Sequence, residues 1–250
     1  MGKLTTAIKN LIIINVIFFV ASQYVMPQMY EWFSLFFPKN EYFGFWQILT
    51  HMFMHGSIMH ILFNMYALWA FGSPLEQMWG SKKFLFFYFS AGVGAALIYT
   101  AVNYFQFNGV YNELINAGLT DANIHQILIT GKYDDSILNY ISQKDLTELY
   151  QIYHTPAVGA SGAIYGVLVA FGMTFPNAKL ALIFFPVPIA AKYFIPGIIA
   201  IDLFMGLGGS SLFGSTGVGI AHFAHVGGAI IGYIMMKYWQ KNQFNNNRLN

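Results

Sequence analysis

Long apolar runs, separated by short polar stretches, follow one another along most of this chain. A helix needs about 20 apolar residues to cross the hydrocarbon core of a bilayer, and several runs have this length. We therefore predict six membrane-spanning helices. They are about Ala7–Met26, His51–Phe71, Phe84–Tyr104, Ser161–Phe175, a helix after Lys192 within Leu180–Met205, and Ala221–Trp239.

Residues 105–157 interrupt this pattern, because they contain no apolar run long enough to cross a membrane. Six of the ten acidic residues of the chain lie here: Glu113, Asp121, Asp134, Asp135, Asp145 and Glu148. We predict an outer insertion with short amphipathic helices, such as Ser136–Tyr150. The whole chain, 1–250, then forms one all-α domain: a tail 1–6, three helices in 7–104, the insertion 105–157, three helices in 158–239 and a tail 240–250.

Composition supports a membrane protein and excludes several other classes. Hydrophobic residues make up 56% of the chain and charged residues 9%, with a mean hydropathy of +0.51. Soluble domains have about 25% charged residues, and disordered chains lack such hydrophobicity. The chain has no cysteine, which excludes disulfides, thiolate metal sites and cysteine nucleophiles. A net charge of +2 without a basic cluster argues against nucleic acid as a partner.

The basic residues predict how the helices are oriented. With the N-terminus inside, the inner segments hold nine lysine and arginine residues and the outer segments hold three. This asymmetry agrees with the positive-inside rule. We therefore predict that both termini lie in the cytosol.

Polar residues inside the spans form a pattern on three predicted helices. Polar groups in the membrane are costly and often functional. The three motifs are His51-Met-Phe-Met-His55 with His60 and Asn64, Gly159-Ala-Ser161-Gly162, and Ala221-His222-Phe-Ala-His225. All three helices start at the outer face, so a serine and several histidines converge below that surface.

This combination favours nucleophilic catalysis, since a serine hydroxyl needs a base to remove its proton. The candidate bases are His60, His222 and His225. Glycines follow both Ser161 and His225, and small residues allow membrane helices to approach closely. The favoured pair is therefore Ser161 and His225. The glycines are Gly162, Gly166 and Gly172 in one helix, and Gly227, Gly228 and Gly232 in the other.

An oxyanion formed at Ser161 would need hydrogen-bond donors. Ser161 opens a helix, whose first backbone N–H groups are free. His60 and Asn64 are four residues apart and therefore share a helix face. Tyr165 lies one turn after Ser161 and is expected to stack on the imidazole. We expect no buried acid beside the base, because Asp202 lies late in its span, and so predict a dyad.

Other interpretations remain open for each motif. Small residues also serve simple helix packing, and a buried histidine or asparagine often only joins helices. His51 and His55 have zinc-ligand spacing, but no glutamate of the metalloprotease motif accompanies them. We therefore expect no metal and no cofactor. A small channel that uses the histidines as a proton path would require charged residues at mid-membrane.

Together with Trp46, these motifs resemble those of the rhomboid intramembrane serine proteases of the bacterial type. The resemblance covers about residues 40–104 and 155–240 and implies a six-helix bundle. It implies that Ser161 is the nucleophile and His225 the base, with oxyanion donors from His60, Asn64 and the Ser161 amide. Supporting roles are implied for Tyr165, Gly159, Gly162 and His222, and a structural role for Glu76 and Gly80.

The resemblance implies transmembrane protein substrates and lipid contact in a bacterial inner membrane. An inactive rhomboid-like protein that binds membrane clients is the alternative. The sequence departs from many bacterial rhomboids in one loop, where Gln47 follows Trp46 in place of an arginine. The insertion 105–157 is also longer than in the simplest members.

Overall fold

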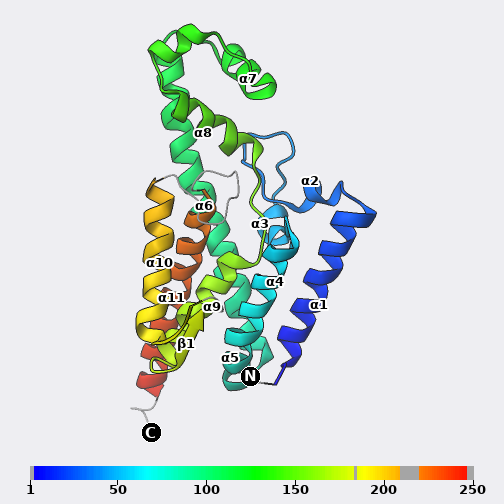
Figure 1. The fold of residues 1–250 in the computed structure, drawn as a ribbon, viewed down its shortest axis with the longest axis vertical. Helices are drawn as coiled ribbons and strands as arrows, with labels where there is room; N and C mark the ends of the chain where they lie inside the picture. Colours follow the sequence, from blue (N-terminus) through cyan, green and yellow to red (C-terminus); the bar gives the residue numbers. More distant parts are fainter. Residues whose placement is uncertain (1–2, 183–184, 209–219, 247–250) are drawn as a thin grey trace.

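The computed structural model describes residues 3–182, 185–208 and 220–246, and these residues are mostly helical. The helices pack side by side in a bundle, from which one long helix projects (Figure 1). The elements in chain order are α1 Thr6–Val20, η1 Ala21–Val25, α2 Met29–Phe33, α3 Gln47–Thr50, η2 His51–Phe53, α4 Ile58–Ala67, η3 Leu68–Gly72, α5 Ser73–Trp79, α6 Ser81–Asn116, α7 Asp121–Thr130, η4 Asp135–Asn139, α8 Gln143–His154, α9 Ser161–Thr174, β1 Lys179–Leu182, β2 Phe185–Ala190, α10 Ala191–Gly208 and α11 Ile220–Asn246.

Three helical segments among the described residues are long and apolar enough to cross a membrane. They are Thr6–Val25, Ile58–Trp79 and Ser81–Asn116, and α9 is a shorter apolar helix. Many of their large apolar side chains are exposed, such as Ile17, Phe63 and Phe86. Exposed apolar side chains on long helices are expected where lipid surrounds the protein. The chain is therefore an integral membrane protein with a helical bundle.

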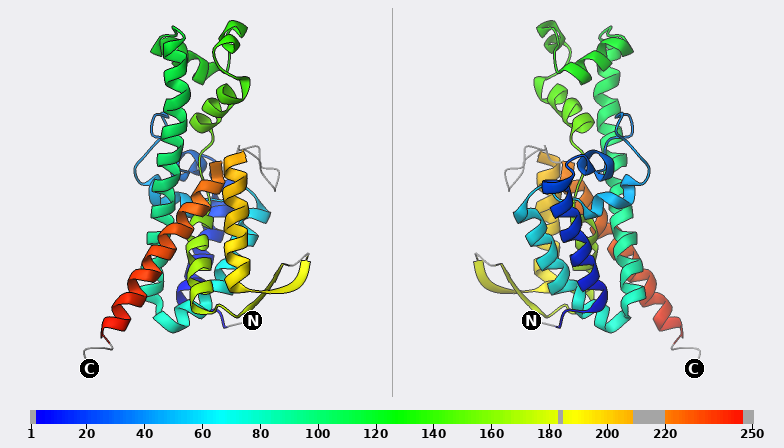
Figure 2. Two further views of the ribbon diagram at one scale, coloured as in Figure 1. Left: turned by 90° about the vertical axis from the view of Figure 1, so that its left-hand side faces the viewer. Right: turned by 90° about the vertical axis from the view of Figure 1, so that its right-hand side faces the viewer.

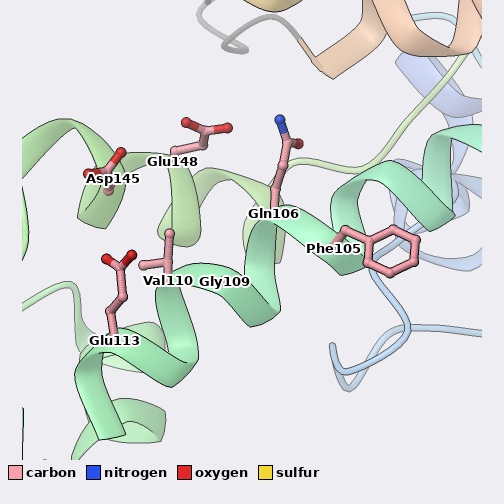
Figure 3. Close-up of a pocket in the computed structure, with 7 residues that line it drawn as sticks. All are labelled: Phe105, Gln106, Gly109, Val110, Glu113, Asp145 and Glu148. Atoms are coloured by element: carbon pink, nitrogen blue, oxygen red, sulfur yellow. The ribbon is translucent and has the colours of Figure 1, made fainter. Parts of the chain in front are cut away.

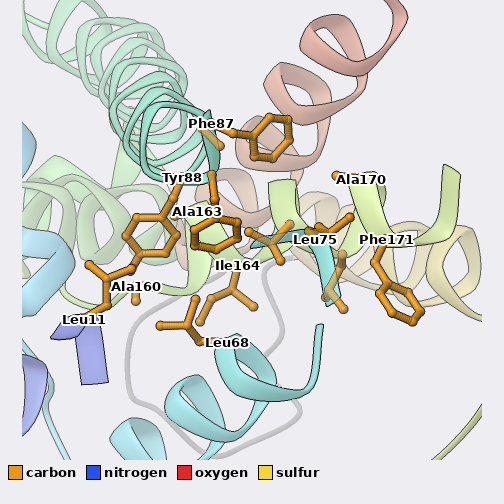
Figure 4. Packing of buried hydrophobic residues seen from close by; sticks show 14 of the residues in the cluster. Leu11, Leu68, Leu75, Phe87, Tyr88, Ala160, Ala163, Ile164, Ala170 and Phe171 are labelled. Atoms are coloured by element: carbon orange, nitrogen blue, oxygen red, sulfur yellow. The ribbon is translucent and has the colours of Figure 1, made fainter. Parts of the chain in front are cut away.

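Helix α9 occupies the centre of this bundle. It packs against both α6 and α11, and α10 lies against α9 and α11 (Figure 2). Nine of its residues are buried, among them Ala163, Ile164 and Val167. They meet Leu68 and Leu75 from the α4–α5 segment and Tyr88 from α6 in one apolar core (Figure 4). A side chain that begins α9 is thereby held by neighbours on several sides.

Glu76 on α5 fastens the start of α1 at the end of the bundle opposite the insertion. Its Oε1 accepts from the Ala7 amide at 2.8 Å and its Oε2 from the Ile8 amide at 3.0 Å. The hydroxyls of Thr5 and Ser81 also donate to this carboxylate. A carboxylate at a helix N-terminus satisfies free N–H groups and complements the helix dipole. Gly80, which ends α5, has φ of 78°, a conformation that favours glycine.

The segment 105–157 is a folded unit rather than a loop. Helix α6 continues without a break to Asn116, twelve residues beyond the predicted end of the span at Tyr104. Helices α7 and α8 then fold back beside its far end (Figure 1). Leu146, Leu149 and Ile152 on α8 pack with Phe107 and Leu114 on α6 in a second core. The apolar face of α8 explains this packing, because an amphipathic helix must bury that face.

Two further features differ from the expected all-α pattern. Strands β1 and β2 form an antiparallel pair, with Lys179 opposite Ala190, before α10 begins at Ala191. Pro186 and Pro188 lie in β2 at the edge of this two-stranded sheet, where a missing N–H is tolerated.

The second difference concerns His51 and His55, which do not share a helix face. His51 begins the short 3-10 helix η2, whereas His55 lies in the stretch between η2 and α4, after Met54 in extended conformation and before a bend.

Candidate functional site

Helices α9 and α11 touch through glycines. A Cβ placed on Gly228 would lie 1.8 Å from the carbonyl oxygen of Gly162, and one on Gly232 would lie 2.7 Å from the Cα of Gly166. Both helix backbones are therefore in direct contact, as the glycine spacing predicts. Gly227 and Gly172 serve other contacts, because they face Ile98 and Ile195 respectively.

This contact brings Ser161 and His225 together. The Nε2 atom of His225 lies 2.8 Å from Oγ of Ser161, although 64 residues separate them in the chain. The ring of Tyr165 stacks on the His225 imidazole, with centroids 4.3 Å apart and planes inclined by 7°. Stacking holds the imidazole in one orientation. Of the expected site residues, the structure thus groups these three closely.

Asp202 on α10 completes this group from the other side of the imidazole. Its Oδ1 atom is 3.3 Å from Nδ1 of His225 and 2.5 Å from Nδ1 of His222. Its Oδ2 atom accepts from the Tyr165 hydroxyl. We call Asp202, Tyr165, His222 and His225 the Asp202 cluster.

The expectation that no buried acid accompanies the base is therefore wrong. Asp202 is only 8% exposed and lies in hydrogen-bonding distance of His225. Its position late in α10 gave no signal, because sequence order does not show that α10 lies beside α9 and α11. The pairing of one carboxylate with two histidines and a tyrosine was visible only in three dimensions.

The other side of Ser161 faces hydrogen-bond donors. Ser161 is the first residue of α9, so its amide is among those that have no partner within the helix. Gly159 precedes it with φ of 115°. A Cβ at Gly159 would lie 2.6 Å from Nε2 of His60 and 3.8 Å from Oγ of Ser161. Glycine is therefore required here by its backbone conformation and by the close approach of His60.

The start of α4 fixes His60, and the His60 carbonyl in turn holds Asn64. Ser57 is the N-cap of α4, and its hydroxyl accepts from the His60 amide at 3.2 Å. The side-chain amide of Asn64 donates to the His60 carbonyl at 2.8 Å, which leaves one N–H of that amide for another acceptor. The buried ring of His55 packs edge-on against His60, with centroids 4.9 Å apart.

Residues of the segment between η1 and α4 support the chain that leads to Ser161. The Gly159 amide donates to the His51 carbonyl at 2.9 Å, and Leu35 and Ala157 exchange two backbone hydrogen bonds. Gln47 is fully buried. Its side-chain N–H groups donate to three backbone carbonyls, those of Glu31, Trp32 and Tyr42. Its side-chain oxygen accepts from the Phe36 amide. Gln47 is thus a structural anchor of this segment, a role that its place after Trp46 did not indicate.

A pocket lies elsewhere, between α6 and α8 of the insertion (Figure 3). Its volume is about 280 Å³, and its lining is Phe105, Gln106, Gly109, Val110, Glu113, Asp145 and Glu148. The pKa of Glu148 is raised above its ordinary value, mainly because the carboxyl is buried. The charge of Lys144 lowers this pKa, and the charge of Asp145 raises it. The lining has no residue in common with the Ser161 site. It contains neither a nucleophile nor a histidine.

Comparison with known proteins assigns the family. The Rhomboid domain model matches residues 42–241. The bovine presenilin-associated rhomboid-like protein, mitochondrial, is 30% identical over 192 residues, which are 76% of this chain and 37% of that protein. Mitochondrial Rhomboid protein 1 of Saccharomyces cerevisiae is 27% identical over 194 residues, 78% of this chain and 42% of that protein. The chain belongs to the rhomboid family.

A shorter match connects the chain to a bacterial member. Rhomboid protease GluP of Bacillus subtilis is 40% identical over 52 residues, which are 21% of this chain and 10% of that protein. The chain thus spans less than half the length of each of these relatives. The expected resemblance to rhomboids is confirmed, and with it the classification among protease-related membrane proteins.

The predicted location in a bacterial inner membrane, with cytosolic termini, is overturned. The relatives named above that match three quarters of the chain are mitochondrial rhomboid proteins by name, not bacterial ones. The prediction failed for a physical reason. The bacterial membrane was implied by the resemblance, whose motifs describe the site, and lysine asymmetry reports only which side of a membrane a segment faces. Neither carries information about which membrane it is.

Proposed function

We propose that this chain is an intramembrane serine endopeptidase that cuts transmembrane protein substrates, with Ser161 as nucleophile and His225 as general base. The observation that carries the proposal is the 2.8 Å contact between Ser161 Oγ and His225 Nε2. A serine next to a base that a third group orients is the arrangement that activates a hydroxyl. Membership in the rhomboid family supports this reaction class.

The bundle supports a site below one membrane surface. In the proposed topology, α1–η1, α4–η3–α5, α6, α9, α10 and α11 each cross once, and the chain starts and ends on the same side. Helix α9 has 14 residues. At 1.5 Å per residue it rises about 21 Å, while the hydrocarbon core is about 30 Å thick. If α9 ends at the inner boundary, Ser161 lies roughly 9 Å inside the outer one, where a substrate helix must unwind to be cut.

The geometry suggests the following sequence of steps. His225 Nε2 accepts the Ser161 proton as Oγ attacks the carbonyl carbon of the scissile peptide. The oxyanion accepts hydrogen bonds from the Ser161 amide, His60 and the free N–H of Asn64. His225 then donates its proton to the leaving amine. Water, deprotonated by His225, attacks the resulting ester and frees Ser161.

Asp202 has a positioning role in this proposal. By accepting a hydrogen bond from Nδ1–H of His225, it keeps the proton on Nδ1 and the lone pair on Nε2, where Ser161 needs it. It also stabilises the imidazolium that forms during the attack. We therefore replace the expected dyad with a triad in which Asp202 is oriented in turn by Tyr165.

A fluorophosphonate probe and a cleavage assay test the proposal together. The purified protein, in detergent or in liposomes, should be labelled at Ser161 and should cut a model transmembrane substrate. Labelling and cleavage should both vanish in Ser161→Ala. An inactive client-binding protein would bind the substrate without labelling or cutting. Turnover by a folded Ser161→Ala protein would refute the serine mechanism.

A further inference from the structure

Three potential metal ligands meet at one point of the Asp202 cluster. Asp202, His222 and His225 each offer one atom, and these atoms all lie within 4.8 Å of one another. The ligands come from two helices: Asp202 lies on α10, and the two histidines lie one turn apart on α11. The proposed reaction uses His225 and Asp202, but it leaves His222 without a chemical task.

We propose that Asp202, His222 and His225 bind a Zn²⁺ ion, and that this ion inhibits the enzyme reversibly. Two imidazole nitrogens and one carboxylate oxygen are a ligand set that zinc accepts. With a water molecule in the fourth position, they would complete a tetrahedron. One negative and two neutral ligands leave a net charge of +1 on the bound ion.

The distances are close to those that such an ion needs. Zinc holds its nitrogen and oxygen ligands at about 2.0–2.1 Å, which places tetrahedral ligands roughly 3.3 Å apart. The Asp202 Oδ1 to His225 Nδ1 separation is 3.3 Å, and that to His222 Nδ1 is 2.5 Å. The second pair must open by less than 1 Å, as the shared hydrogen bond is replaced by two bonds to the metal. The ligand atoms of the two histidines lie within 4.8 Å of each other and must settle at the same tetrahedral separation.

Access and support are also present. The side chains of His225, His222 and Asp202 are 21%, 15% and 11% exposed, so a hydrated ion reaches them without a change of fold. The Tyr165 hydroxyl donates to Oδ2 of Asp202 and leaves Oδ1 for the ion. Such second contacts orient metal ligands.

Inhibition follows from the two nitrogens of one imidazole. In the active form the proton of neutral His225 is on Nδ1, and Nε2 accepts from Ser161. When Zn²⁺ takes the Nδ1 lone pair, the single ring proton must be on Nε2. That nitrogen then donates to Ser161 and cannot remove its proton. The ring of His222 must shift its proton in the same way, because its Nδ1 also faces Asp202. Zinc binding therefore moves one proton from Nδ1 to Nε2 in each histidine through solvent and needs no redox partner.

Metal binding is measured first, without reference to activity. Zn²⁺ is titrated into the Ser161→Ala protein in detergent, in competition with a chromophoric zinc indicator. We expect one ion per chain. Adding His222→Gln should weaken binding at least tenfold, whereas adding His125→Gln, on the exposed face of α7, should not change it. Asp202→Asn serves as a second ligand variant of nearly unchanged shape.

Inhibition is measured next, and this part rests on the proposed function. Cleavage by the wild-type protein should fall at least tenfold with saturating Zn²⁺, recover fully with EDTA, and ignore Mg²⁺. The rate of the His222→Gln protein is compared with its own metal-free rate. The Zn²⁺ concentration that halves this rate should be at least ten times higher than for the wild-type protein.

The possible failures are distinguishable. Absence of stoichiometric binding, or equal binding in His222→Gln, would overturn the site. Stoichiometric binding with unchanged cleavage would overturn the inhibitory role. Absence of cleavage by metal-free wild-type protein would refute the proposed function and leave the binding result intact.

Discussion

Two carboxylates lie buried at different places in this bundle, Glu76 at 4% exposure and Asp202 at 8%. Each accepts several hydrogen bonds, most of them from residues at least 20 positions away in the sequence. Around Glu76, the donors are two backbone amides of α1 and the hydroxyls of Thr5 and Ser81. Around Asp202, they are two imidazoles and a phenol.

The difference lies in what the donors can do. Amides and aliphatic hydroxyls keep their protons at any ordinary pH, so the Glu76 contacts only fasten α1 to α5. The imidazoles beside Asp202 can gain, lose or relocate a proton, and one of them contacts Ser161. Similar numbers of hydrogen bonds therefore serve stability in one place and chemistry in the other. The following substitutions test this contrast.

The largest effect should come from substitutions of Ser161 and of His225, the imidazole that lies between Ser161 and Asp202. We expect Ser161→Ala and His225→Ala each to reduce cleavage by about 10⁶-fold or to below detection. Because the two residues act as a unit, the double variant should be no worse than either single one. Single-turnover cleavage of a transmembrane substrate measures this. Additive losses would show that the two residues act independently.

Asp202→Asn should have the next largest effect. The asparagine keeps the shape but no longer stabilises the imidazolium, and we expect a loss of about 10⁴-fold in kcat with little change in KM. Tyr165→Phe, which removes one hydrogen bond to the same carboxylate, should cost less. Kinetics with a saturable substrate separate kcat from KM. Wild-type kcat in Asp202→Asn would restore the dyad.

Gly228→Ala tests whether the Asp202 cluster depends on close helix packing. Its new Cβ would lie 1.8 Å from the Gly162 carbonyl, so α9 and α11 must separate. A displacement near 1 Å can cost 10²-fold in rate, and overpacking costs about 1–3 kcal/mol of stability. Gly197→Ala, where no atom lies within 4 Å of the new Cβ, is the matched control. Thermal unfolding and cleavage rates should change together only in Gly228→Ala.

Glu76→Gln should affect stability rather than catalysis. The substitution removes hydrogen bonds to a charged group, each of which contributes about 1.5–3 kcal/mol. The free energy of unfolding should therefore fall by at least the contribution of one such bond. Cleavage per folded molecule should stay within about twofold of wild type. Glu31→Gln, at an exposed position, should shift stability by less than about 0.5 kcal/mol. A selective loss of kcat in Glu76→Gln would erase the contrast with Asp202.

Local pattern was enough to predict much of the bundle and part of the site. Apolar runs of helical length predicted α1, α4, α6 and α9, because a residue in lipid must be apolar wherever it lies in the fold. The glycine spacing predicted that α9 and α11 approach closely, since each glycine removes the side chain that would separate two helices. The contact between Ser161 and His225 follows from that spacing together with the starting points of the two helices.

Tertiary structure alone decided how Asp202, Gln47 and Glu76 are used. Each is a single polar residue whose partners lie between 5 and 71 positions away, and several of these partners are backbone atoms that carry no sequence signal. Tertiary packing also extended α6 beyond its apolar run, because α8 covers the extension with an apolar face of its own. Periodicity along one segment reports the side on which that segment is apolar. The partner that meets a lone polar group depends on how the segments are arranged in space.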